Sequence, residues 1–262
     1  MLEGILGAIG FLTTLPSGRS YNLEQFQRRT YLSTVVGILI GLILLAVATL
    51  VFTLIPGYPG VVAVVVIVSI YIVTGFHHLD AISDFGDGIA AHGSREKKIK
   101  AMKDLALGTG GAAVVIFYIL ALFVVIQAIA NMNSDGFWWL GLGTALLSAE
   151  VISKHSMLTA ARFGKPLHQG MGSMISDHTG SKQFAISLFI SAVVCTAAMG
   201  IAGLTALLTG IVMSVVVVVV SNRHFGGLNG DCLGTAHEMG RLVALTTIFM
   251  FYAGGLVAWM PW

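Results

Sequence analysis

The chain has 262 residues, 56% of them hydrophobic and only 10% charged, and its mean hydropathy is +0.90. A soluble domain carries about 25% charged residues, so this composition excludes an ordinary soluble protein. No stretch resembles a basic nucleic-acid-binding patch. Long uncharged runs approach the ~20 residues that a helix needs to cross the membrane. The sequence therefore predicts an all-α, polytopic integral membrane protein.

About seven helices are predicted to cross the membrane, within a single transmembrane domain that covers 1–262. The stretch 1–15 is too short to span comfortably, so we expect an interfacial or re-entrant helix there. A complete crossing by this stretch is the alternative. Gly203 marks a very short hairpin between the fifth and sixth spans. The predicted spans are 31–55, 61–80, 110–130, 137–154, 184–202, 204–221 and 242–260.

Positive charges indicate the orientation of these spans. All 14 Lys and Arg residues lie in four segments, which alternate along the chain with connections that carry none. The positive-inside rule places the four segments in the cytoplasm, as in a multi-pass protein of the cell membrane. All eight histidines fall at or near the same face. Because topology requires no histidine, their concentration there predicts an active site that faces the cytoplasm.

Three carboxylates follow the second predicted span. If the helix continues through residue 88, Asp80, Asp84 and Asp87 fall within an arc of about 80°, together with His77. Carboxylates on one face repel each other, and a divalent cation relieves that repulsion. Carboxylate oxygens suit Mg²⁺, Mn²⁺ or Ca²⁺, and Mg²⁺ commonly takes further ligands from substrate phosphate. The pattern predicts a divalent-metal site for a phosphate or diphosphate substrate, with a solvated acidic helix end as the alternative.

A basic segment follows these aspartates. It begins at Arg95 and ends with Lys103 beside Asp104, just before the glycine-rich start of the third span at 108–111. A helix start with small residues can accept phosphate on its backbone N–H groups. The segment is therefore a candidate phosphate site, although positive charges in a cytoplasmic loop also serve topology alone.

Two further polar segments lie between spans. Segment 223–234 combines glycines, which permit close backbone approach, with the oxygen atoms of Asn229 and Asp231. These oxygens could bind a metal or substrate, or the segment could be a simple turn. Segment 164–180 is polar and punctuated by glycine, which is typical of a flexible linker or a substrate lid.

Five strings, taken together and in chain order, resemble the cobalamin synthase (adenosylcobinamide-GDP ribazoletransferase) family. The departures from the family pattern are Ala81 for Gly, Ser83 for Ala, Leu105-Ala106 for Ser-Arg, and Asn229 for Thr. The strings are FLTTLPSG at 11–18, HLDAISDFGDG at 78–88, MKD at 102–104 with Gly108, GKPLHQGMGSMI at 164–175, and GGLNGDCLGTAHEM at 226–239.

The resemblance implies the last assembly step of vitamin B12-type cofactors. Adenosylcobinamide-GDP would react with α-ribazole or its 5′-phosphate, which gives adenosylcobalamin or its 5′-phosphate and releases GMP. The family's enzymes need Mg²⁺ and sit in the membrane, in contact with lipid. The oligomeric state stays open, with a homo-oligomer as one alternative.

Residue roles follow from the matched motifs. Asp80, Asp84 and Asp87 would hold Mg²⁺, and Lys103 and Arg95 would stabilise the departing GMP. The general base stays open among three residues, and the other four matched positions would contact substrate. The general-base candidates are Asp104, His78 and Asp231, and the substrate contacts are Gly227, Asn229, Gly230 and His168.

Two other functions compete with this interpretation. A CDP-alcohol phosphatidyltransferase also places aspartates at the end of a membrane helix, and Asp87-Gly88-x₂-Ala91 begins its motif. His92 then stands where that motif has Arg, and its final paired aspartates are absent. A divalent-cation transporter would also use membrane carboxylates. The acidic residues here gather at one face instead of along a pathway, which disfavours transport.

Overall fold

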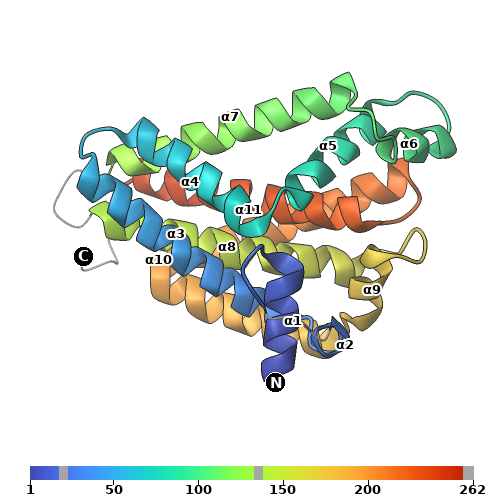
Figure 1. Cartoon of the computed structure of the whole chain (residues 1–262), viewed down its shortest axis with the longest axis horizontal. Coiled ribbons are helices and arrows are strands. Elements are labelled where there is room, and N and C mark those ends of the chain that lie inside the picture. Colours follow the sequence, from blue (N-terminus) through green and yellow to red (C-terminus); the bar gives the residue numbers. More distant parts are fainter. Residues whose placement is uncertain (18–22, 133–137, 256–262) are drawn as a thin grey trace.

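The computed structural model describes residues 1–17, 23–132 and 138–255, and within these ranges the chain is helical and contains no strand. The start of the fourth predicted span and the end of the seventh lie outside the described residues. Figure 1 shows the helices. They are α1 (Leu2–Leu12), α2 (Leu23–Gln27), α3 (Leu32–Leu54), α4 (Pro59–Thr74), α5 (His77–Ala90), α6 (Arg95–Met102), α7 (Thr109–Met132), α8 (Trp138–Phe163), α9 (Met171–His178), α10 (Ser181–His224) and α11 (Gly230–Ala253).

Several helices have the length and composition of membrane spans. α3, α7 and α10 each pass this test alone, and α4 with α5 passes it as a bent pair, so the described residues contain three to four such spans. This confirms the predicted class, an all-α protein suited to a membrane. α1 is apolar but has only 11 residues, about 16 Å of helix, which is shorter than the hydrocarbon layer.

The long helix α10 is a hairpin of two arms. Its backbone leaves the helical region at Gly200 (φ 56°, ψ −134°), and the α-carbon of Gly203 approaches the carbonyl of Cys195 closely. Residues eight positions apart in a straight helix would be separated by about 12 Å, so the chain must reverse between them. The hairpin predicted at Gly203 is present, and its turn residue is Gly200.

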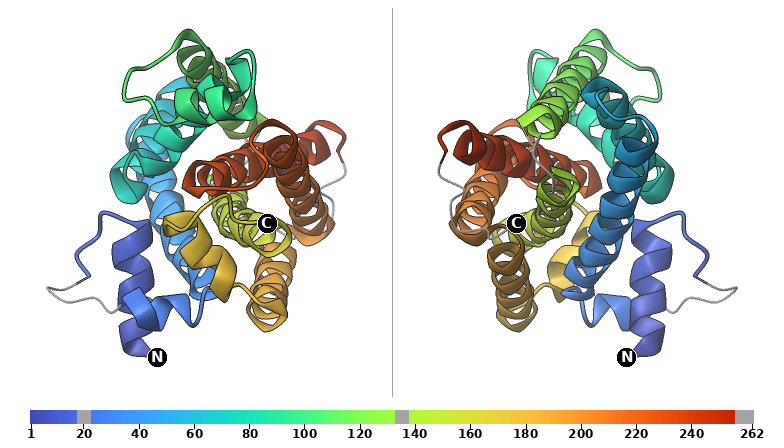
Figure 2. Two further views of the ribbon diagram at one scale, coloured as in Figure 1. Left: turned by 90° about the vertical axis from the view of Figure 1, so that its right-hand side faces the viewer. Right: turned by 90° about the vertical axis from the view of Figure 1, so that its left-hand side faces the viewer.

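The central helix of the fold is α8. Nearly every side chain from Leu142 to Ala161 is buried, and Figure 2 shows the other long helices arranged around it. α3 packs directly on α8. A β-carbon at Gly37 would lie 2.8 Å from the backbone of Glu150, and one at Gly41 would lie 2.6 Å from the backbone of Leu147. Small residues at such crossings are the usual way for membrane helices to pack closely.

A sharp bend separates α4 from α5. The two helices meet at 96°, because Gly75 adopts φ +70°, a region that favours glycine. Thr14, which follows α1, binds the freed end of α4: its N–H donates to the Val73 carbonyl (2.8 Å) and its hydroxyl to the Ile72 carbonyl (2.6 Å). The predicted span 61–80 is therefore interrupted after Thr74, and the supposed continuation of one helix through residue 88 is wrong. The aspartates lie on a separate helix that diverges from α4 (Figure 1).

Candidate functional site

Asp80, Asp84 and Asp87 form the acidic face of α5. The bend before α5 does not separate them, because all three residues lie within this one helix. Asp80 is exposed, whereas Asp84 and Asp87 are partly buried. α5 packs against α11 so closely that a β-carbon at Gly234 would lie 2.5 Å from that of Ala81. This contact brings Asp231, in the first turn of α11, to the same region.

Electrostatic interactions show which predicted residues the fold gathers. Burial is the main reason that the pKa of the Asp84 carboxyl rises to about 7, and the charges of Asp231 and Asp80 add to the rise. Burial also raises the pKa of Asp231. The hydrogen bond from Asn229 and the charges of Lys103 and His168 partly oppose that shift. These predicted residues, from four parts of the chain, therefore lie near enough to influence one another electrostatically, and we call them the charged site.

Asp87 has a structural partner that the sequence did not reveal. Its Oδ2 accepts the N–H of Gly108 and its Oδ1 accepts the N–H of Gly111, both at 2.8 Å. The carboxylate thus caps the N-terminus of α7, where a helix favours negative charge. The prediction of a phosphate site at 108–111 is wrong in this respect, because Asp87 occupies two of its amides. A carboxylate has about four lone-pair sites, so Asp87 retains capacity for a metal.

This cap should be measurable as stability. We expect Asp87→Ala to lower the free energy of unfolding by about 1–2 kcal/mol, because two amides at the start of α7 lose a charged acceptor. Chemical denaturation in detergent with EDTA measures the cap without any contribution from bound metal. Asp80→Ala on the same helix is the control, since an exposed aspartate should contribute less than about 0.5 kcal/mol. Equal losses in both variants would contradict the capping role.

The remaining predicted residues occupy less central positions. Asp104 is exposed, and its Oδ1 accepts the N–H of Ala106 at 3.1 Å in a local turn. Asn229 is the N-cap of α11: its Oδ1 accepts the Cys232 N–H, while its Nδ2 donates to Asp231 at 2.6 Å. The Arg95 guanidinium lies beside Gly226, the turn residue with φ +88°.

Segment 164–180 is anchored to the 226–229 turn. The Leu167 N–H donates to the Leu228 carbonyl (2.7 Å), and the Leu228 N–H donates to the Lys165 carbonyl (2.8 Å). Gly227 packs against this strand-like pair, where a β-carbon would lie 2.9 Å from the Lys165 carbonyl oxygen. The segment then continues into α9. These contacts favour a structured cover over a flexible linker.

A buried ionic network lies beneath the charged site, and sequence reasoning missed most of it. The Arg241 guanidinium binds Glu150 through Nε at 2.5 Å and Glu238 through Nη1. All three side chains are buried, at 1% exposure or less. The network also includes Tyr71 and Tyr118, which donate to Glu238, His237, which contacts Glu238, and Lys154, which contacts His237.

Part of this network could have been anticipated. Glu150 and Lys154 lie four residues apart on a predicted span, and Glu238 and Arg241 three apart near another. Ionisable residues in membrane helices usually face the bundle interior and pair with one another. The ion pair between Glu150 of α8 and Arg241 of α11 could not be predicted, because the sequence alone does not specify that these two helices are in contact.

His78 connects the network to the surface. Its ring lies 4.1 Å from that of His237, and its buried Nδ1 has no hydrogen-bond partner among the described residues. Ligand atoms of His78, His237 and Glu238 approach within 4.8 Å, the only such group that the described ranges contain. Lys154 and Arg241 already bind His237 and Glu238, and their positive charges disfavour a metal cation there.

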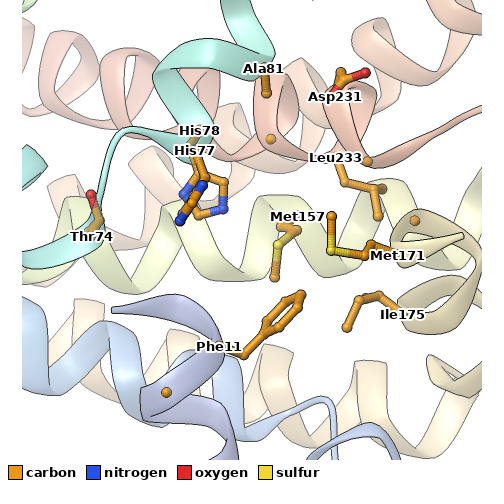
Figure 3. A pocket seen from close by; sticks show the side chains of 14 residues that line it. Phe11, Thr74, His77, His78, Ala81, Met157, Met171, Ile175, Asp231 and Leu233 are labelled. Carbon is orange, nitrogen blue, oxygen red and sulfur yellow. The ribbon is translucent and has the colours of Figure 1, made fainter. Parts of the chain in front are cut away.

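A cavity of about 330 Å³ is lined by residues of α1, α5, α8, α9 and α11 and by Thr74 at the end of α4. We call it the α9 cavity. Figure 3 shows Asp231 and Ala81 on one side of it, the two histidines toward one end, and the apolar side chains of Phe11, Met157, Met171 and Ile175 on the opposite side. Its lining residues are Gly10, Phe11, Thr74, His77, His78, Ala81, Met157, Met171, Gly172, Ile175, Gly230, Asp231, Leu233 and Gly234.

Comparison with known proteins identifies relatives of the chain. Residues 4–249 match the family model described as cobalamin-5-phosphate synthase. A protein of Methanococcoides burtonii named adenosylcobinamide-GDP ribazoletransferase is 40% identical, over 91% of this chain and 89% of its own. Proteins of the same name from Methanosarcina barkeri and Methanosarcina mazei are 40% and 38% identical, over 90% and 94% of this chain and 88% and 94% of their own. No solved structure matches significantly.

Proposed function

Because the chain belongs to the cobalamin-5-phosphate synthase family, we propose that it is an adenosylcobinamide-GDP ribazoletransferase. It joins adenosylcobinamide-GDP to α-ribazole, or to its 5′-phosphate, and releases GMP. The observation that carries this proposal is the family match over 4–249, in which the family's separate motifs converge on one charged site. This likeness favours the transferase over a lipid phosphatidyltransferase or a cation transporter.

The reaction is an in-line displacement at phosphorus. The 3′-hydroxyl oxygen of α-ribazole bonds to the cobinamide-side phosphorus, and the bond from that phosphorus to the bridging oxygen breaks. GMP leaves with the electron pair, and the hydroxyl proton passes to a base on the protein. Asp231 is best placed to take the proton, because it lines the α9 cavity and interacts electrostatically with Asp80 and Asp84.

We further propose that the acidic face binds Mg²⁺. The donors fit, since hard carboxylate oxygens gather there and mutual repulsion helps raise the pKa of Asp84 to about 7. When bound, Mg²⁺ neutralises charge that develops on the diphosphate. Mg²⁺ typically needs only one or two carboxylates beside water and phosphate, so a closed cluster of three is unnecessary.

Positive side chains would hold the nucleotide end. Lys103 is exposed and close enough to Asp231 to influence it electrostatically, and His168 influences Asp231 in the same way. Both can contact phosphate oxygens as these gain negative charge. Arg95, beside the 226–229 turn, lies next to the same segment and replaces the arginine that the family has after Lys103-Asp104.

The proposed topology has seven spans in the cell membrane. They are α3, α4, α7, α8, the two arms of α10 and the C-terminal part of α11, while α5, α6 and α9 lie at the cytoplasmic face. Support comes from the distribution of lysine and arginine, because all except Lys154 and Arg241, which the fold buries within α8 and α11, fall in segments on that side.

One assay tests the proposed function. Purified protein in detergent should release GMP and form a larger corrinoid when adenosylcobinamide-GDP, α-ribazole and Mg²⁺ are all present. Omission of α-ribazole should abolish GMP release, because the enzyme transfers the phosphoryl group to a hydroxyl acceptor and not to water. Chelation of Mg²⁺ by EDTA should abolish both products. GMP release without α-ribazole would identify a hydrolase instead.

A further inference from the structure

The α9 cavity has the size of a small-molecule site. Its volume of about 330 Å³ lies near the lower end of the ~300–1,000 Å³ that such sites usually have. A corrinoid carrying GDP is several times too large for it. An aromatic nucleoside is small enough to enter, so size separates the two substrates of the proposed reaction.

The cavity wall suits a flat aromatic base. Phe11 of α1, Met157 of α8 and Met171 and Ile175 of α9 surround its apolar part (Figure 3). Thioether sulfur and aromatic rings make favourable contacts with aromatic ligands. Methionine side chains are also flexible, so they can adjust to the shape of the bound base.

The polar end of the cavity joins the charged site. Asp231 lines the cavity and also interacts with Asp80, Lys103 and His168. A nucleoside with its base among the methionines would therefore place its ribose hydroxyls next to Asp231. This is the position that the attacking hydroxyl needs relative to the acidic face.

We propose that the α9 cavity binds the nucleoside acceptor, with the base against Phe11, Met157 and Met171 and the ribose at Asp231. α9 closes over the base, and the corrin ring stays outside the cavity. This inference rests on the proposed function, since it assigns one of that reaction's two substrates to a defined site. In this arrangement, the apolar wall of the α9 cavity selects the base.

Met171→Trp tests this assignment at the mouth of the cavity. Met171 is 68% exposed, so a larger side chain can be accommodated without repacking the core. We expect the KM for α-ribazole to rise about tenfold or more, while the KM for adenosylcobinamide-GDP stays within about twofold. Met174→Trp is the matched control, because Met174 lies on the same helix and does not line the cavity.

A second variant removes a wall residue. Phe11→Ala should also raise the KM for α-ribazole, because the base loses an aromatic contact. The cavity is not the nucleoside site if both variants raise the KM for adenosylcobinamide-GDP more than the KM for α-ribazole. The same conclusion follows if Met174→Trp raises the KM for α-ribazole as much as Met171→Trp does.

A binding measurement separates this inference from the proposed function. α-Ribazole alone should raise the unfolding temperature of the wild-type protein in a concentration-dependent manner, since a ligand that binds the folded state stabilises it. The shift should disappear in Met171→Trp and persist in Met174→Trp. Stabilisation that is equal in all three proteins would overturn the cavity assignment even if the enzyme makes cobalamin. Loss of the shift in Met171→Trp would support the cavity even if the corrinoid product were absent.

Discussion

Replacing Asp84 by asparagine is expected to lower the rate of GMP release by about 100-fold or more, because a bound metal contributes several kcal/mol of charge stabilisation and about 1.4 kcal/mol corresponds to tenfold in rate. Asp84 lies between Asp80 and Asp87 on the acidic face and interacts with Asp231 on α11. Asparagine keeps the shape and removes the charge. The loss should therefore report metal binding and not packing.

Stability should change in the opposite direction. The raised pKa of Asp84 means that the folded state holds this proton more tightly than the unfolded chain does. The stability that the proton contributes is therefore lost as pH rises from the ordinary carboxyl pKa of about 4 to about 7, and the full cost of the charged carboxylate is present above that pH. In EDTA at pH 8, Asp84→Asn should therefore unfold at the same temperature as wild type or at a higher one. Adding Mg²⁺ should stabilise wild type more than the variant.

The activity assay uses purified protein in detergent over a range of Mg²⁺ concentrations. Asp177→Asn is the control, because Asp177 is an exposed aspartate on α9 that does not line the cavity. It should keep wild-type activity and Mg²⁺ dependence. Near wild-type turnover of Asp84→Asn, with an unchanged Mg²⁺ requirement, would rule out the metal assignment.

Arg241→Met is expected to have the largest effect on stability, a loss of about 3–5 kcal/mol. The Arg241 guanidinium binds both Glu150 and Glu238, and all three side chains are buried. Methionine fills similar space but leaves two carboxylates without their cation. Uncompensated buried charge is far more costly than the loss of an exposed ion pair.

Thermal unfolding in detergent measures this effect, and a decrease on the order of 10 °C is expected. Arg162→Met is the matched control. Arg162 is exposed on α8 and donates to the Ser181 hydroxyl at 3.1 Å, so its loss should change stability by no more than about 0.5 kcal/mol.

A combined variant tests the cause. When Glu150→Gln and Glu238→Gln accompany Arg241→Met, no buried charge of the triad is left unpaired, and most of the lost stability should return. If the triple variant is less stable than Arg241→Met alone, the arginine contributes through packing and not through charge. The comparison therefore distinguishes the two explanations.

Composition and residue spacing were sufficient for the class of fold and for the grouping of the three aspartates on one helical face. A charged fraction of only 10% leaves too few polar residues to cover a soluble surface, so the all-α membrane class followed directly. The spacing of Asp80, Asp84 and Asp87 placed them on one helical face whether or not that helix continued from α4, because the face depends only on local geometry.

Local sequence was insufficient where the chain changes direction. Gly75 permits the bend, but glycine also occurs within straight helices of this chain, such as Gly37 and Gly41 of α3. The bend is stabilised by Thr14, which lies 58 and 59 residues before Ile72 and Val73 and binds the carbonyls that the broken helix leaves free. Such a partner becomes visible only when α1 and α4 are packed together.

The same distinction applies to the site. The sequence by itself determined which residues could bind metal and phosphate, because carboxylate, lysine and backbone chemistry belong to the residue types. Only the tertiary structure decided which atoms remain available. It assigned Asp87 to the amides of α7, paired Arg241 with glutamates of two helices, and enclosed the α9 cavity between helices that are distant in sequence. These outcomes depend on contacts between helices, and residue type and spacing carry no information about which helices meet.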